Sequence, residues 1–264
     1  MNNDSKQVAV VTGGASGIGE ASARRLALDG YAVAILDVNA DGADRIAAEL
    51  RDSVDAESYA CDVTDTEGLY HIAAQVEKDL GPVNVLVTSA GVLENSGTVM
   101  DMDVEAHDRL WQVNYHGTLH TCRAFARAMM ERGRGAVCTI GSIMSTAPSP
   151  LPAYTPSKTA ISRLTQILAV ELGRRGIRVN CVGPTYVLTP AIQARIDAGK
   201  RDPEVLRDSS ALKILVTPEA VADVIAFLCS DQARAITGVH LPVDAGWAAA
   251  TPYQAFAGGT PWNQ

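Results

Sequence analysis

The stretch Thr12-Gly13-Gly14-Ala15-Ser16-Gly17-Ile18-Gly19 decides the fold of this 264-residue chain. It joins a continuous apolar run, residues 8–12, to residues 17–30, where apolar side chains recur at helical spacing. Glycines in such a turn permit positive φ and let both a phosphate and a neighbouring helix approach the backbone closely. The N-terminus of the following helix then presents free N–H groups and a dipole to an anion. The pattern predicts a strand, a phosphate-binding turn and a helix.

On both sides of this turn, short apolar runs alternate with helical patterns. Runs that are apolar throughout are typical of strands covered by helices on both faces. Strands are expected at residues 8–12, 32–37, 58–61, 83–88, 136–141, 177–182 and 239–243. Helices are expected at residues 17–30, 41–51, 65–80, 104–132, 153–175 and 218–230. This alternation predicts an α/β fold: a single doubly wound, Rossmann-like domain over residues 1–264, with a mostly seven-stranded parallel sheet.

Two segments depart from the alternation. Residues 186–217 contain Pro190, Pro203 and a cluster of charges, and they are weakly helical over 191–198, which predicts a mobile lid over a substrate opening. Residues 247–264 are rich in glycine, proline and aromatic residues. This C-terminal tail is too apolar for free solvent and too interrupted for a helix, so we expect it to dock on another surface.

Composition restricts the partners of the chain. It is 47% hydrophobic and 20% charged, which excludes wholesale disorder. Thirty acidic residues against 22 basic ones give a net charge of −8, which opposes binding to nucleic acid or to an anionic membrane. The polar start of the chain lacks a signal-peptide pattern, and no apolar window is long enough to span a membrane. A cytoplasmic location is therefore expected.

No metal site is expected from the sequence. The histidines His116 and His120 stand four residues apart on an expected helix, a spacing that metal sites use, but a third ligand is not evident. The cysteines are scattered without a Cys-x-x-Cys pair, so we expect reduced, buried side chains. They are Cys61, Cys122, Cys138, Cys181 and Cys229.

Asp37 ends the strand that follows the glycine turn. In dinucleotide-binding units, an acid at this place accepts a hydrogen bond from a ribose 2′-hydroxyl. A carboxylate about 4 Å from an added phosphate charge costs roughly 1 kcal/mol in water and about 4 kcal/mol at an effective dielectric near 20. Neither Arg nor Lys stands in the turn or directly after Asp37 to offset this repulsion. We therefore expect NAD to be favoured over NADP at least about tenfold in kcat/KM; the alternative is that Asp37 caps a helix or turn.

Tyr154-Thr155-Pro156-Ser157-Lys158 begins the expected helix 153–175. Residues at i and i+4 share a helix face, so the phenol and the ammonium are expected to point into one cleft. A free tyrosine has a pKa near 10, and a fixed cation favours the phenolate and lowers that pKa. Ser142 follows a strand whose carboxyl end should line the ligand crevice. The pattern predicts a general acid–base site, with a surface Tyr–Lys pair as the alternative.

Taken in order, these motifs resemble those of the short-chain dehydrogenase/reductase family. The resemblance covers nearly the whole chain, from about Lys6 to Trp247, and each piece is modest evidence by itself. The further pieces are Cys61-Asp62-Val63, Ser89-Ala90-Gly91, Val113-Asn114-Tyr115-His116-Gly117, Pro184 to Thr189, and Val243-Asp244-Ala245-Gly246.

The resemblance implies an NAD-dependent oxidoreductase that interconverts a secondary alcohol and a ketone. It implies that Tyr154 is the general acid/base and that Lys158 holds the nicotinamide ribose and lowers the tyrosine pKa. Ser142 would hydrogen-bond the substrate oxygen, and Asn114 would kink its helix and position a water of a proton relay. The implied cofactor-binding residues are Gly13, Ser16, Gly17, Ile18, Gly19, Asp37, Asp62, Val63, Ser89, Ala90, Gly91, Tyr154, Lys158, Pro184, Val187 and Thr189.

The implied substrate pocket is mostly apolar, which favours a hydrophobic secondary alcohol or its ketone. Its residues are Leu93, Ser142, Met144, Leu151, Tyr154, Thr185 and Tyr186. In the lid, basic residues could meet an anionic substrate, although a solvated helix face is the alternative. They are Arg195, Lys200, Arg201 and Lys213.

The chain departs from the family pattern at three places. Thr88 and Ser89 replace two asparagines before Ala90, and the Thr88 hydroxyl is expected to substitute for the missing amide. Thr185 replaces a glycine where nicotinamide and substrate meet. The interval from Ser142 to Tyr154 is about one residue short and contains three prolines. These departures concern substrate shape more than proton transfer.

Two other functions remain open. A 3-oxoacyl thioester reductase would normally use NADPH and bind an acidic carrier, which Asp37 and the negative net charge disfavour. A non-catalytic NAD-binding scaffold or sensor would not need all four of Ser142, Tyr154, Lys158 and Asn114.

The resemblance also implies a homotetramer built on the helices at 104–132 and 153–175 and on the last strand. An apolar stripe on the second helix would form part of the interface, and the C-terminal tail would reach a neighbouring cleft. The stripe is Ala160, Ile161, Leu164, Ile167, Leu168 and Leu172.

Overall fold

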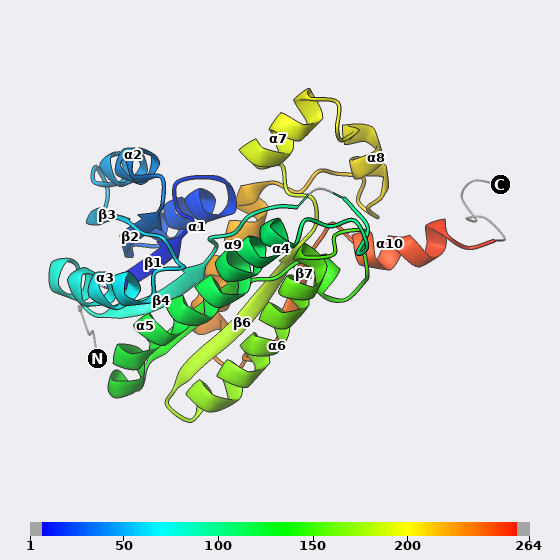
Figure 1. Ribbon diagram of the computed structural model, residues 1–264. Coiled ribbons are helices and arrows are strands. Elements are labelled where there is room, and N and C mark those ends of the chain that lie inside the picture. Colours follow the sequence, from blue (N-terminus) through cyan, green and yellow to red (C-terminus); the bar gives the residue numbers. More distant parts are fainter. Residues whose placement is uncertain (1–6, 95, 258–264) are drawn as a thin grey trace.

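The computed structural model describes residues 7–94 and 96–257 (Figure 1). It contains one seven-stranded parallel sheet in the order β3-β2-β1-β4-β5-β6-β7. The strands are β1 (Val8–Thr12), β2 (Ala32–Asp37), β3 (Ala56–Ala60), β4 (Val83–Thr88), β5 (Gly135–Ile140), β6 (Ile177–Pro184) and β7 (His240–Val243). The expected doubly wound, Rossmann-like α/β fold is confirmed.

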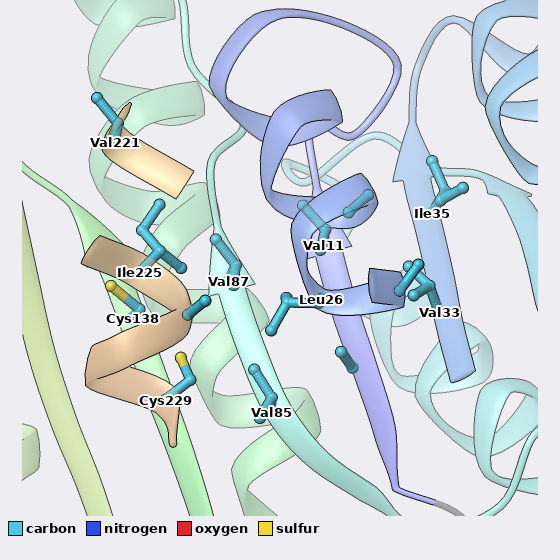
Figure 2. Close-up of a cluster of buried hydrophobic side chains, with 14 of the residues drawn as sticks. Val11, Leu26, Val33, Ile35, Val85, Val87, Cys138, Val221, Ile225 and Cys229 are labelled. Carbon is cyan, nitrogen blue, oxygen red and sulfur yellow. The ribbon is translucent and has the colours of Figure 1, made fainter. Parts of the chain in front are cut away.

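Helices cover both faces of this sheet. One group comprises α1 (Gly17–Leu28), α2 (Ala40–Leu50) and α9 (Pro218–Cys229). The other comprises α3 (Thr66–Asp79), α5 (Gly117–Arg132) and α6 (Tyr154–Gly173). Successive β1 residues alternate between the two cores: Ala9 and Val11 pack with the first group, Val8 and Val10 with the second. Figure 2 shows the first core, where Leu26 of α1 and Ile225 of α9 pack over Val87 of β4.

The strand order reverses between β1 and β4, because β2 and β3 lie on one side of β1 and β4 to β7 on the other. At such a switch point the loops that leave the carboxyl ends of the strands diverge and open a crevice for ligands. The glycine turn leaves β1 there, and the segment after Thr88 leaves β4. This part of the sheet therefore positions the candidate site.

The expected helix 104–132 is not continuous. It divides into α4 (Val104–Trp111), the π-helical turn Gln112–His116 and α5. The interruption lies where the resemblance implied that Asn114 kinks its helix. A π turn changes the hydrogen-bond spacing but leaves the apolar periodicity almost intact, so the periodicity by itself predicted one continuous helix. Asn114 lies inside this turn and is completely buried.

The lid segment forms two short helices, α7 (Pro190–Asp197) and α8 (Pro203–Asp208), of which the second was not expected. Thr189 and Asp202 cap them, and each begins with proline. Proline is well tolerated at the first helical position because its missing N–H has no partner there in any helix. The mobility of residues 186–217 stays a prediction.

The expectation that the tail is too interrupted for a helix is wrong. Residues Trp247–Gln254 form α10, which projects away from the sheet and has no fully buried residue (Figure 1). Its only internal proline, Pro252, lies near the end of the helix. The part of the tail from 258 onward lies outside the described residues.

The apolar stripe assigned to a subunit interface is also mostly wrong. Ile161, Leu164, Leu168 and Leu172 are buried within this chain. Of the stripe, Ile167 is exposed, and Val170, which was not part of it, is 66% exposed. Helical spacing identifies a face but does not tell whether the sheet or another subunit covers it. Among the described helices, none is long and apolar enough to cross a membrane.

Candidate active site

Two adjoining cavities open at the carboxyl end of the sheet. A long groove of about 800 Å³ runs from Asp37 past the glycine turn to Lys158 and Thr189. A smaller cavity of about 180 Å³ lies between the ends of β5 and β6, the start of α6 and the lid. Tyr154 lines both cavities, together with Ile18, Leu93, Ile140 and Thr189. The residue that the sequence identified as the acid–base group is therefore part of the wall that the two spaces share.

The glycine turn has the geometry that a bound pyrophosphate needs. Gly13 has φ +66°, and a side chain there would lie 2.7 Å from Cα of Ala90. Ser16 precedes α1 without using its hydroxyl as a helix cap, so the hydroxyl and the first N–H groups of α1 are free for an anion. Residues present at this end of the groove thus fit the diphosphate of a dinucleotide.

Gly19 does not line the groove, although a cofactor role was expected for it. A Cβ at this position would lie only 2.0 Å from the carbonyl oxygen of Gly13. Because Gly19 has no Cβ, the first turn of α1 can pack against the glycine turn. Pro184 and Val187 were also assigned to the cofactor, and they line the smaller cavity instead. The other expected cofactor residues line the groove: Gly13, Ser16, Gly17, Ile18, Asp37, Asp62, Val63, Ser89, Ala90, Gly91, Tyr154, Lys158 and Thr189.

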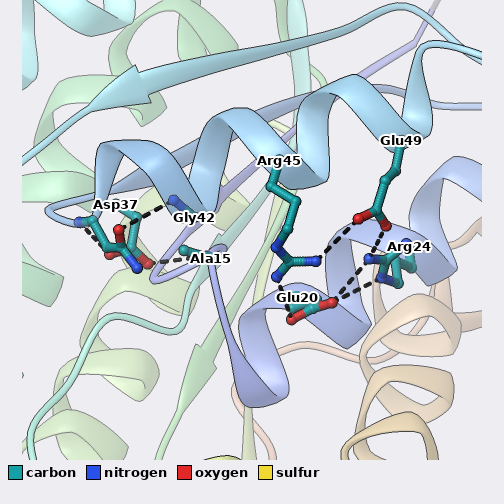
Figure 3. Close-up of polar contacts among 8 residues, drawn as sticks. Ala15, Glu20, Arg24, Asp37, Gly42, Arg45 and Glu49 are labelled. Carbon is teal, nitrogen blue, oxygen red and sulfur yellow. Dashed lines mark hydrogen bonds and ion pairs between the residues drawn. The ribbon is translucent and has the colours of Figure 1, made fainter.

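Backbone hydrogen bonds hold Asp37 in the groove (Figure 3). Its two carboxylate oxygens accept from the N–H groups of Ala15, at 3.0 Å, and Asn39, at 2.9 Å. The cap of α2 is provided by Asn39, not by Asp37. The neighbouring arginines Arg24 and Arg45 form ion pairs with Glu20 and Glu49. Their charge is therefore already compensated by carboxylates.

The segment after β4 is not held in place by Thr88, as was expected, but by Thr12. The Thr88 hydroxyl is buried and has no hydrogen-bond partner, so it does not substitute for the missing amide. Instead, Thr12 Oγ1 accepts from the N–H of Ala90 at 3.3 Å, and the Thr12 carbonyl accepts from the N–H of Ser89 at 3.2 Å. Thr12 was part of the quoted turn, but its side-chain role depends on β4 lying beside β1.

Asn114 fixes the loop after Gly91 from inside the π-helical turn. Its side-chain oxygen accepts from the N–H of Val92 at 2.8 Å, and its amide donates to the carbonyl of Val92 at 3.1 Å. A side chain on Gly91 would lie 3.2 Å from Asn114 Oδ1 and 4.0 Å from Lys158 Nζ. The loop that lines the groove is therefore held next to Lys158.

Ser142, Tyr154 and Lys158 converge where the cavities meet. Ser142 begins a single 3₁₀ turn, where its hydroxyl accepts from Met144 N–H. Ser145, in the same turn, donates to the carbonyl of Lys158 at 2.9 Å and ties the turn to α6. Lys158 is only 6% exposed, and its Nζ lies 5.5 Å from the centre of the Tyr154 ring and donates to the Ile140 carbonyl at 2.8 Å. The predicted triad is therefore brought together.

The pKa shifts run against the simple expectation that Lys158 acidifies Tyr154. Burial raises the pKa of Tyr154 to about 12, and the hydrogen bond with Ser142 lowers it by a smaller amount. Burial likewise lowers the pKa of Lys158 to about 8. Both groups lose water, and desolvation favours the neutral form of each. Sequence spacing brought the pair together but did not reveal how dry the site is.

Glu94 is a site residue that the sequence analysis missed. Its carboxylate accepts from the N–H of Tyr154 at 2.8 Å and from the N–H of Ala153 at 3.1 Å. A carboxylate at a helix N-terminus is favoured by the free N–H groups and the helix dipole. Glu94 thus holds the first turn of α6 and the tyrosine on it. Sixty residues separate Glu94 from Tyr154, so no local pattern indicated this cap.

All of the expected substrate residues line the smaller cavity: Leu93, Ser142, Met144, Leu151, Tyr154, Thr185 and Tyr186. The Thr185 hydroxyl is buried there without a hydrogen-bond partner. The lid adds Ile192, Arg195 and Arg201. The cavity is therefore apolar in its walls but carries two arginines.

His116 and His120 stack on each other with ring centres 6.1 Å apart. Within residues 7–94 and 96–257, no three side chains of His, Cys, Asp or Glu are grouped so that they could hold a metal ion. All five cysteines are buried and free.

The chain thus combines a doubly wound sheet, a glycine turn at its switch point, and a Ser–Tyr–Lys group after β5 and at the start of α6. The family profile described as Enoyl-(Acyl carrier protein) reductase matches residues 13–248. A galactitol 2-dehydrogenase of Rhizobium johnstonii is 36% identical over 242 residues, which are 90% of this chain and 94% of that protein. The chain belongs to the short-chain dehydrogenase/reductase family, whose members use nicotinamide cofactors.

Other relatives show the range of the family. A cis-4-hydroxycyclohexanecarboxylate dehydrogenase of Sinomonas cyclohexanicum is 37% identical over 92% of this chain and 97% of that protein. A solved xylitol dehydrogenase with bound NAD⁺ has a TM-score of 0.86 and 29% identity, and covers 93% of this chain and 100% of that chain. The structure of ElxO with bound NADP has the same TM-score and 28% identity, over 92% of this chain and 99% of that chain. Related folds thus bind either cofactor.

Proposed function

We propose that this protein is an NAD-dependent dehydrogenase of secondary alcohols, with Tyr154 as the general acid/base. The observation that carries the proposal is the position of Tyr154, which lines both the dinucleotide-sized groove and the small cavity. Ser142 and Lys158 lie beside it, and Glu94 fixes its backbone. The relatives named for polyol and cyclic alcohol substrates support the same reaction class.

In the oxidative direction, the residues of this chain bind the alcohol and remove its proton. Ser142 Oγ and Tyr154 Oη hold the hydroxyl oxygen, and Tyr154 Oη accepts the proton. A bound oxidised nicotinamide would supply the hydride acceptor for the carbinol carbon. Lys158 then passes the proton towards solvent, and a pKa of about 8 suits this task because the lysine can both accept and release a proton near neutral pH. In the reductive direction, Tyr154 donates its proton to the ketone oxygen.

The proposal is tested by screening purified protein with NAD against aliphatic, alicyclic, aryl and polyol alcohols and following NADH formation. We expect oxidation of secondary alcohols, at a rate that rises from pH 7 to pH 10. The sign follows from Tyr154, because its raised pKa leaves little phenolate at neutral pH and more as the pH increases. A parallel screen of 3-oxoacyl and enoyl thioesters with NADPH should be inactive. Turnover confined to the thioesters would contradict the proposal.

The preference for NAD is proposed to rest on the Asp37 carboxylate. We expect the wild-type protein to use NAD at least about tenfold more efficiently than NADP in kcat/KM. Asp37→Asn should lower this preference at least about tenfold, because the charge is removed while one side-chain oxygen can still accept from a backbone N–H. Asp62→Asn is the matched control: it removes another groove carboxylate, and the ratio for the two cofactors should stay unchanged. Equal wild-type efficiency with both cofactors would contradict the role of Asp37.

A further inference from the structure

The small cavity contains more positive charge than oxidation of a neutral hydrophobic alcohol requires. Three ionisable side chains other than tyrosine line it, namely Glu94, Arg195 and Arg201. Both arginines come from the lid segment and are half-buried. The other lining residues are uncharged, and many are apolar.

Neither arginine has an acidic partner among the described residues. The Arg195 guanidinium donates to the backbone carbonyl of Glu94 at 3.2 Å, and that of Arg201 donates to the backbone carbonyl of Lys200 at 2.9 Å. By contrast, Arg207, the next arginine along the lid, pairs with Glu204. A guanidinium has five N–H donors, so one carbonyl leaves most of its hydrogen-bonding capacity unused. Arg195 and Arg201 can therefore still bind an anion.

The Glu94 carboxylate forms no ion pair with either arginine, but its charge still offsets part of theirs. It accepts hydrogen bonds from the N–H groups of Ala153 and Tyr154 at the N-terminus of α6. Counting only the lining side chains, two guanidinium groups and one carboxylate leave one net positive charge. This excess matches a monoanion, such as a carboxylate, better than a phosphate monoester, which carries about −1.5 to −2 at pH 7. A planar guanidinium also fits a carboxylate through two parallel hydrogen bonds.

We propose that the substrate is a secondary hydroxy acid whose carboxylate binds Arg195 and Arg201 of the lid. This deepens the proposed function and rests on it. The carbinol is held by Ser142, which follows β5, and by Tyr154, which begins α6, whereas the carboxylate is held by the lid. An apolar cavity of about 150 Å³ holds benzene, so about 180 Å³ accommodates a six-membered ring between the two ends.

Unreactive probes test this site without turnover. The complex with NADH is titrated calorimetrically with cyclohexanecarboxylate and with cyclohexanecarboxamide, which has the same shape but no charge. We expect the carboxylate to bind at least tenfold more tightly, and its advantage to shrink at high salt. Equal or tighter binding of the carboxamide, or no binding of either probe at 10 mM or so, would overturn the assignment. Cyclohexyl phosphate forms a third arm, and tighter binding of this dianion would overturn the choice of a carboxylate.

Charge-removing variants locate the effect. In Arg195→Gln and Arg201→Gln the ratio of the two dissociation constants should fall towards one. In Lys200→Gln, which removes a neighbouring exposed charge that does not line the cavity, the ratio should stay at the wild-type value. If the ratio of dissociation constants changes as much in Lys200→Gln as in the arginine variants, the effect comes from the overall charge of the lid, and the assignment of the site to Arg195 and Arg201 is overturned. Failure of the protein to bind NADH or to oxidise any alcohol contradicts the proposed function, whereas failure of the probe ratio alone contradicts only the carboxylate site.

Discussion

Tyr154→Phe should lower kcat/KM for alcohol oxidation by two or more orders of magnitude, while NADH still binds. The substitution removes one oxygen and leaves the ring that lines both cavities. General acid–base catalysis commonly contributes about 10²–10⁴ in rate, and the proposal assigns that step to the Tyr154 hydroxyl beside Ser142. Steady-state kinetics with the best alcohol of the screen give the loss, and fluorescence titration gives the dissociation constant for NADH.

Tyr59→Phe is the matched control for this experiment. Tyr59 lies on β3, and its hydroxyl donates to Asp79 at 3.0 Å, away from both cavities. The same loss of a phenolic hydroxyl at that position should leave kcat/KM within about twofold of the wild-type value, as expected for a surface change. Near-normal turnover in Tyr154→Phe would show that another group moves the proton and would remove the acid–base assignment.

Lys158→Met should abolish most activity and at the same time raise the melting temperature. Activity is expected to fall at least a hundredfold, because the variant loses the proton path and the cation beside Tyr154. Stability is expected to rise because burial lowers the pKa of Lys158 from 10.5 to about 8, so keeping this lysine protonated at neutral pH costs on the order of 3 kcal/mol. The variant also loses the hydrogen bond to the Ile140 carbonyl, which lowers its stability by about 1 kcal/mol and offsets part of this gain. The net gain corresponds to a melting temperature higher by a few degrees.

The pH dependence of this stability gain has a definite sign. Below about pH 8, Lys158 is protonated in both the folded and the unfolded chain, so the full penalty of the buried charge applies. Between pH 8 and 10.5 the folded protein loses the proton first, and the penalty falls as the pH rises. The difference in melting temperature between variant and wild type should therefore be largest at pH 7 and shrink towards pH 10. Lys78→Met, at an exposed lysine of α3, should show no such trend, and a lower melting temperature for Lys158→Met would contradict the explanation.

Local patterns were sufficient for the strands, for most of the helices and for the glycine turn. Four or five consecutive apolar residues, as in β1 and β2, are typical of strands buried on both faces, so these elements were predicted almost to the residue. β3 contains fewer apolar residues than β1 and β2, and it begins two residues earlier than expected. The helix α10 was missed, and the break at Gln112–His116 was expected only from the resemblance, as a kink at Asn114. Hydrogen-bond spacing and exposed helices leave little trace in an apolar pattern.

In the candidate site, too, the residues that a local pattern indicates were predicted, and those that depend on tertiary contacts were not. Tyr154, Lys158, Ser142 and Asp37 were found because each follows a strand or shares a helix face with its partner. Glu94 was missed, and Thr88 was given a role that Thr12 performs, because both depend on which strands and loops become neighbours. The direction of the Tyr154 pKa shift was also missed, since it depends on how much water the folded chain excludes.

The order of residues along the chain was therefore enough to establish the sheet, the phosphate turn, the acid after β2 and the family. Those features depend on side-chain size, polarity and spacing over a few residues, which are written in the sequence directly. Only the folded chain decided that Glu94 caps the helix of Tyr154, that Lys158 is dry, and that Arg195 and Arg201 face the cavity without acidic partners. These facts depend on contacts between segments 60 to 101 residues apart and on the low local dielectric that burial creates.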